Sequence, residues 1–177
     1  MPKLERLEWI APLSEGRGVT LSNDPEADLY LAQDANALLL GVLYDSQLAT
    51  RLAFAAPLKL QRRLSHLDMA RIAEADPVEF AAIFSQKPAL HRFPGKFAGL
   101  TVQLASFLTA RYGAEPSLLW TQATTVDDLA TRLLELPGFG REKTDWTIGM
   151  LGRLEYLPFD GWDGYRTQAR PPSRSSS

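Results

Sequence analysis

A short helix-breaking string, LPGFG at residues 136–140, constrains the fold of this chain more than any other feature. It lies between two runs with helical periodicity, one ending near Leu136 and one reaching about Leu154. Pro137 cannot continue the first helix, while Gly138 and Gly140 allow a turn without a penalty from a Cβ atom. The string therefore predicts two helices joined by a tight hairpin.

The start of the second helix carries a chemical expectation. Its first backbone N–H groups have no intrahelical partner, and with the positive end of the helix dipole they suit a phosphate oxygen. Arg141 and Lys143 follow directly and add positive charge. We expect Gly138, Phe139 and Gly140 to contact the DNA backbone, without reading bases. An ordinary helical hairpin with a glycine turn is the alternative.

The rest of the chain carries helix signals and no β-strand alternation. Asp34 is a suitable N-cap for ANALLLGVLYDSQ, a run so apolar that it predicts a buried helix. A longer helix is expected from about Lys96 to Tyr112, and Thr125 with Asp128 resembles a capping box. Pro57 should kink or split the helix that contains it. The expected fold class is all-α.

Composition excludes several classes of site. The chain has 177 residues, is 45% hydrophobic, carries a net charge of −2 and contains no cysteine and two histidines. Disulfides, cysteine-ligated zinc and iron–sulfur clusters are therefore excluded, and no metal or cofactor is expected. There is no secretion signal and no apolar run of the roughly 18 residues that span a membrane. We expect a cytoplasmic monomer with no membrane partner.

Three segments together resemble one family. LLELPGFGREKTDWTIGML looks like the helix-hairpin-helix motif of the HhH-GPD superfamily of DNA glycosylases, of the endonuclease III and MutY type. LLLGVLYDSQLAT is similar to that superfamily's early buried helix, and RFPGKFAGLTVQLASFL falls at its turn into a long helix. The strings DPEAD and PALHRFPG are similar to a bacterial HhH-GPD-type base excision repair branch.

The resemblance implies a two-lobed helical fold and a partner, double-stranded DNA with a damaged or mismatched base. The domain would cover residues 27–165, between an irregular segment at 1–26 and a disordered tail at 166–177. The implied function is base excision repair by a monofunctional N-glycosylase. Gln47 falls where the family places a glutamine that reaches into the DNA stack.

The chain departs from the family at the catalytic positions. Bifunctional members carry a nucleophilic lysine where this chain has Glu142; Lys143 is one residue later, about 100° round the helix, and should point elsewhere. No lyase activity is therefore expected. The family's aspartate, about eighteen residues beyond that lysine position, corresponds to Asp160, with Asp163 as a neighbouring alternative. The resemblance makes Asp160 the catalytic carboxylate that faces a cleft with the hairpin.

Other residues keep two readings each. Tyr44 and Asp45 either line a base pocket or serve as a packing aromatic and a surface charge. Trp162 is a candidate for stacking on an extruded base. His91 and Arg92 either belong to a second phosphate-contacting turn or have packing roles. A DNA-binding or lesion-sensing protein without catalysis is the alternative function, and a helical module that binds no DNA is a third.

Overall fold

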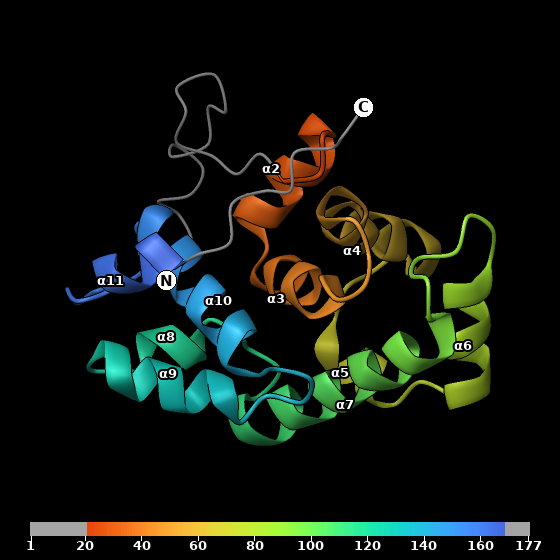
Figure 1. The fold of residues 1–177 in the computed structure, drawn as a ribbon. Coiled ribbons are helices and arrows are strands. Elements are labelled where there is room, and N and C mark those ends of the chain that lie inside the picture. The colour runs from red at the N-terminus through yellow and green to blue at the C-terminus, as the bar shows by residue number, and fades with distance from the viewer. Residues whose placement is uncertain (1–20, 169–177) are drawn as a thin grey trace.

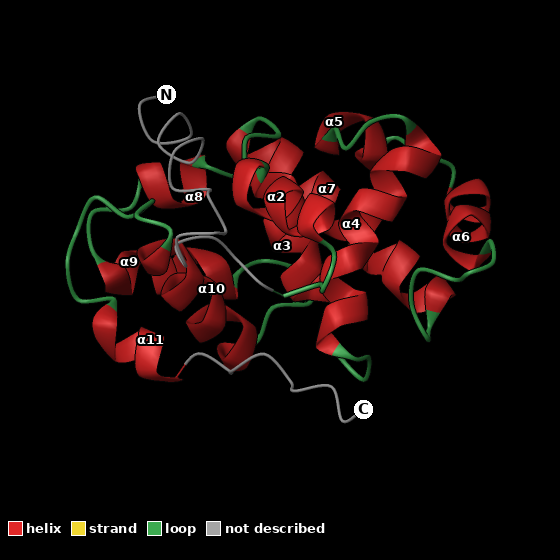
Figure 2. Cartoon of the chain, turned by 90° about the horizontal axis from the view of Figure 1, so that it is seen from above, coloured by secondary structure: helices red, strands yellow, loops and turns green. Residues whose placement is uncertain are grey.

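The computed structural model describes residues 21–168, and every regular element in that part of the chain is a helix (Figures 1 and 2). The all-α prediction is confirmed. The helices are α2 (Pro25–Gln33), α3 (Ala35–Tyr44), α4 (Thr50–Leu64), α5 (Met69–Ala73), α6 (Pro77–Ser85), α7 (Pro94–Tyr112), α8 (Leu118–Thr121), α9 (Val126–Leu134), α10 (Arg141–Arg153) and α11 (Asp163–Gln168). No helix between residues 21 and 168 is long and apolar enough to cross a membrane.

The helix ends lie where the capping residues predict them. The Asp34 carboxylate accepts the Ala37 N–H at 3.0 Å and begins α3. The Thr125 hydroxyl accepts the Asp128 N–H at 3.1 Å and begins α9. The long helix α7 ends at Gly113, whose φ of 58° is left-handed. Local sequence signals therefore fix these helix boundaries.

Helix α3 forms the centre of the core, as its apolar run predicts. All residues from Ala37 to Tyr44 are buried, and the helix packs against α2, α4 and α10. At its carboxyl end the Tyr44 hydroxyl donates to Thr101 Oγ1 at 2.8 Å, while Thr101 in turn donates to the Phe97 carbonyl. Since an unpaired buried hydroxyl would be costly, this pair ties α3 to α7.

Helix α4 is not split by its proline. It runs without interruption from Thr50 to Leu64 with Pro57 inside it and buried. A proline inside a helix removes one hydrogen bond, at a cost of about 3 kcal/mol. Burial of the apolar face of α4 against α2 and α3 offsets this loss, which the sequence pattern alone did not indicate.

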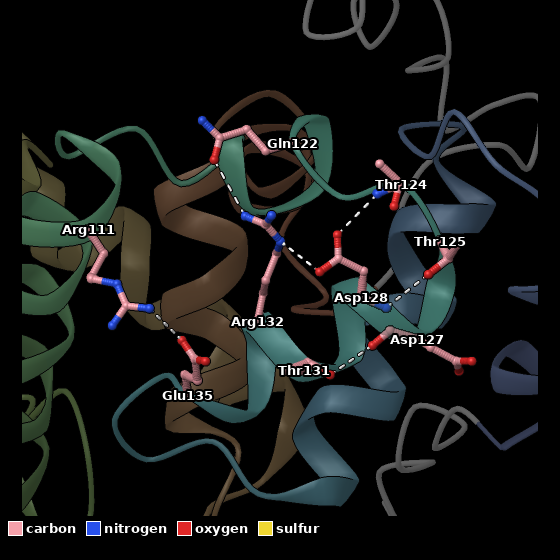
Figure 3. A network of polar contacts seen from close by, with 9 residues as sticks. All are labelled: Arg111, Gln122, Thr124, Thr125, Asp127, Asp128, Thr131, Arg132 and Glu135. Carbon is pink, nitrogen blue, oxygen red and sulfur yellow. Dashed lines mark hydrogen bonds and ion pairs between the residues drawn. The ribbon is translucent and has the colours of Figure 1, made fainter.

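A polar network steadies α9, the helix that leads into the hairpin (Figure 3). Arg132 Nε donates to Asp128 Oδ1 at 3.2 Å, and Asp128 Oδ2 accepts the Thr124 N–H at 3.2 Å. At the other end of the helix, Arg111 on α7 pairs with Glu135 at 3.0 Å. These contacts hold both ends of α9 and hence the position at which the hairpin begins.

The expected domain boundaries differ slightly from the helices. Helix α2 begins at Pro25, inside the segment expected to be irregular, and α11 continues to Gln168, inside the segment expected to be disordered. The remaining parts of those two expectations, residues 1–20 and 169–177, lie outside the described residues.

Candidate nucleic-acid interface

Three segments that are far apart in the sequence enclose a cavity of about 460 Å³. Residues 45–47, in the loop after α3, form one wall. Lys96 and Phe97, in the first turn of α7, form another. Residues 140–143 and Trp146, from the hairpin and α10, complete it. The volume is within the range of about 300–1,000 Å³ that small-ligand sites occupy.

The hairpin turn is held firmly against the core. Gly138 has a φ of 81°, and a Cβ atom there would lie 2.6 Å from Leu43 Cδ1. The Phe139 N–H donates to the Leu136 carbonyl at 3.0 Å, and the Phe139 ring is buried. Phe139 therefore anchors the turn through its side chain, so only its backbone remains available for the DNA contact expected from the sequence.

The amino end of α10 is open toward the cavity. Gly140 is the N-cap residue, and a Cβ atom placed on it would meet nothing within 4 Å. The first helical hydrogen bond runs from the Thr144 N–H to the Gly140 carbonyl at 3.0 Å, so the N–H groups of residues 141–143 precede the helical ladder. Arg141 is highly exposed, and its Nε lies 3.9 Å from Asp145 Oδ2. This end of α10 offers donors, positive charge and space.

Gln47 occupies the tip of the loop between α3 and α4. Its φ is 52°, in the left-handed region, and its side chain is exposed. The Thr50 hydroxyl donates to Asp45 Oδ1 at 3.1 Å and so joins the two ends of this loop. The structure thus presents Gln47 at the rim of the cavity, facing the same space as the hairpin.

Lys143 lies in the cavity wall, which differs from the expectation that it points away from the site. It is partly buried, and its Nζ donates to Ser46 Oγ at 2.6 Å. Glu142 lines the same cavity and is exposed. The cavity reaches round the first turn of α10, so an offset of one residue does not remove Lys143 from it.

His91 connects the segment before α7 to the loop after α3. Its Nδ1 accepts the Phe93 N–H at 3.0 Å, and its Nε2 donates to the Tyr44 carbonyl at 2.9 Å. The ring stacks on Phe97 with 3.6 Å between centroids. Burial lowers the pKa of His91, and the nearby Lys96 and Lys143 lower it further. The neutral imidazole therefore has a structural role beneath the cavity.

Asp160 and Trp162 lie on the segment between α10 and the first turn of α11, and neither is among the described residues that line the cavity. The Trp162 ring packs directly on Gly152, in the last turn of α10, about 18 Å along the helix from Gly140. A Cβ atom on Gly161 would lie 3.4 Å from Val126, the first residue of α9. Asp160, the residue before Gly161, is exposed to solvent.

Tyr44 also lies outside the cavity wall, because its ring is fully buried beneath the loop that the wall uses. Burial raises the pKa of its hydroxyl well above the usual range. Of the two readings open for Tyr44, packing is therefore the one that its position supports. For the neighbouring Asp45 the position supports the other reading, because this residue lines the cavity.

Sequence reasoning did not assign Ser46, Lys96, Phe97 or Trp146 to the site. A signal for Trp146 was present, because positions three apart share a helix face and Lys143 precedes it by three. Phe97 and Ser46 carry no such signal, since only the packing of separate helices brings them together. Among the described residues, no group of three His, Asp or Glu side chains could hold a metal ion.

Comparison with known proteins identifies no relative of this chain: no protein-family model, no curated protein and no solved structure matches it.

Proposed function

We propose that this protein binds double-stranded DNA through the hairpin and acts as a monofunctional N-glycosylase on a damaged or mismatched base. The observation that carries the proposal is the cavity shared by the open end of α10 and the Gln47 loop. Backbone anchoring and base extrusion need these two parts next to each other. The sequence resemblance to the HhH-GPD superfamily supports the same reading.

The charge around the cavity supports a phosphate partner. Lys96, Arg141 and Lys143 line it, against the carboxylates Asp45 and Glu142. The cations that line the cavity therefore outnumber the carboxylates by one. The net charge of the whole chain is −2, so this local excess of cations runs against the overall composition.

The aromatic wall supports a planar ligand. Phe97 and Trp146 both line the cavity, and Trp146 is held by an edge contact with Phe54 at 5.0 Å between centroids. An extruded base is recognised by stacking and by polar groups at its edge. Gln47, at the exposed loop tip, would fill the space that the base leaves in the duplex.

A DNA-binding protein without catalysis is the second candidate. The observation that favours it is that Asp160, the residue expected to assist cleavage of the glycosidic bond, is not among the described residues that line the cavity. This candidate shares the hairpin and the cations with the first and differs only in chemistry. The two are separated by measuring base excision.

The test of DNA binding uses Gly140→Asp in the full chain. An aspartate at this N-cap caps the N–H groups of α10 and places negative charge where a phosphate is proposed. We expect thermal stability to be retained and affinity for a duplex to fall at least tenfold. Gly164→Asp is the matched control: it makes the same charge change in the first turn of α11, where an added Cβ atom would meet nothing within 4 Å, and Gly164 does not line the cavity.

The test of catalysis is a screen of wild-type protein over duplexes that each carry one lesion or mismatch, with strand cleavage by alkali as the readout. Excision of at least one base supports the glycosylase. Salt-dependent binding without any excision supports the second candidate. A wild-type protein that binds no duplex at low salt would contradict both.

A further inference from the structure

We propose that Asp45, rather than Asp160, is the catalytic carboxylate of this site. The inference rests on the proposed glycosylase function and assigns its chemistry. Two carboxylates are found among the described residues that line the cavity, Asp45 and Glu142. Asp45 is buried, with 7% of its surface exposed, whereas Glu142 is exposed to solvent.

Asp45 is held in a defined position. It is the first residue after α3, and its N–H donates to the Val42 carbonyl at 3.2 Å. Its Oδ1 accepts the Thr50 hydroxyl at 3.1 Å. The backbone bond fixes the position of the residue, and the Thr50 hydroxyl fixes the orientation of its carboxylate. Such preorganisation is what electrostatic catalysis requires.

The charge of Asp45 has a nearby complement. Lys143 donates to Ser46, the next residue, so an ammonium stands beside the backbone that carries the carboxylate. Buried charges in proteins are stable when an opposite charge accompanies them. The site therefore tolerates a buried carboxylate, and Phe97 and Trp146 lower the local dielectric around it.

The chemistry follows from this placement. When the bond between C1′ and the base nitrogen breaks, its electron pair leaves with the base and the sugar becomes cationic. The Asp45 carboxylate stabilises that cation and takes one proton from a water molecule, whose hydroxyl forms the new bond to C1′. The same proton then passes to the departing base nitrogen. Water is the only co-reactant, and the products are the free base and an abasic sugar.

Asp160 is the contrasting position. It is exposed on the segment between α10 and α11, and the adjacent Gly161 and Trp162 pack against the start of α9 and the end of α10. Asp160 is not among the described residues that line the cavity, and a charge on the exposed surface is screened by water, so it contributes little to a transition state inside the cavity.

The experiment compares Asp45→Asn with Asp160→Asn in single-turnover excision of a lesion that the wild-type protein removes. Asn is nearly isosteric with Asp and can still accept from Thr50. We expect the rate of Asp45→Asn to fall at least a hundredfold and that of Asp160→Asn to stay within about twofold of wild type. Both variants should bind a duplex containing an abasic analogue as tightly as wild type does.

Two controls exclude a merely structural role for Asp45. Thr50→Val removes the hydrogen bond that closes the loop and leaves the carboxylate, so its rate should fall less than tenfold. In Asp45→Ala, added formate should restore part of the rate, which a folding defect would not allow. Absence of rescue by formate, or a larger loss of rate in Thr50→Val than in Asp45→Asn, would overturn the assignment.

The outcomes separate this inference from the function beneath it. If Asp45→Asn excises the base at the wild-type rate, the catalytic role of Asp45 is wrong, while the proposed glycosylase function still stands. Loss of excision in Asp160→Asn alone restores the assignment that the family resemblance implies. A wild-type protein that excises nothing overturns the glycosylase and the role of Asp45 together.

Discussion

Lys143 Nζ donates a hydrogen bond of 2.6 Å to Ser46 Oγ, and this contact joins the first turn of α10 to the loop after α3. The two residues are 97 positions apart in the sequence, and both line the cavity. The bond thus connects the proposed phosphate-binding end of the hairpin to the loop that carries Gln47. Its strength determines how rigidly the two parts face each other.

A double-mutant cycle measures that strength. Lys143→Met, Ser46→Ala and the combination should show a coupling of about 1–2 kcal/mol in the free energy of unfolding, because the bond is charge-assisted and partly buried. Chemical denaturation of the four proteins provides the measurement. If the losses in unfolding free energy of the two single variants sum to that of the double variant within about 0.3 kcal/mol, the contact is not maintained in solution.

The two hairpin glycines should respond differently to substitution. Gly138→Ala strains a φ of 81° and brings Cβ against Leu43 Cδ1, so it should cost about 2 kcal/mol or more in stability. Gly140→Ala meets open space and should cost about 1 kcal/mol or less. Thermal melts of both variants test this difference. Equal losses would mean that the turn differs from the one described.

Much of the fold could be predicted from local signals. The side chains of Asp34 and Thr125 cap the starts of α3 and α9, and the backbone freedom of Gly113 ends α7. These helix ends therefore follow directly from the sequence. Of the two outcomes expected at Pro57, a kink or a split, the split does not occur, because the continuity of α4 depends on partners that only the tertiary fold supplies.

The site was less predictable than the fold. Only the family resemblance implied that Gln47 and the hairpin share a site, and both line the cavity. Asp160 could not be placed by counting residues, because the packing of Trp162 on Gly152 decides where the chain goes after α10. Asp45 follows an apolar helix and carries no pattern that separates a buried acid from a surface one.

Acid should destabilise the protein through His91. Its pKa in the folded state is lowered from 6.5, so below that pH the unfolded chain takes up a proton more readily than the folded one. Stability from this group is fully present above about pH 6.5 and is lost as the pH falls through the folded pKa. His91→Gln should flatten this part of the profile, measured by chemical denaturation from about pH 7.5 to about pH 5. An unchanged slope would exclude His91 as its source.

The salt dependence of DNA binding should report the cations around the cavity. Each phosphate neutralised by a side chain adds about −0.9 to the slope of log affinity against log salt concentration. Lys96→Gln should reduce the slope by about one such step, since Lys96 is exposed at the cavity wall. Lys59→Gln provides a control with the same loss of charge on α4, away from the cavity wall. Equal slopes for Lys96→Gln and the wild type would remove Lys96 from the interface.

Lys143 tests the expectation that the protein has no lyase activity. A lyase needs a neutral amine that attacks C1′ and forms a Schiff base with the opened sugar. Lys143 lies in the cavity, so position alone does not prevent this reaction. Its Nζ, however, donates to Ser46 Oγ at 2.6 Å, and Glu142 occupies the position that the family resemblance assigns to the lysine of the lyases. We therefore expect no covalent adduct when the wild-type protein is treated with borohydride on abasic DNA.

The informative variant in this experiment is Ser46→Ala, which releases Nζ from its hydroxyl partner. If that hydrogen bond is what restrains Lys143, Ser46→Ala should trap more adduct than the wild type, and Ser46→Ala with Lys143→Met should trap none. An adduct that forms with wild-type protein and disappears in Lys143→Met would contradict the expectation. It would make Lys143 a nucleophile and the protein a bifunctional enzyme, with Asp45 beside the Schiff base.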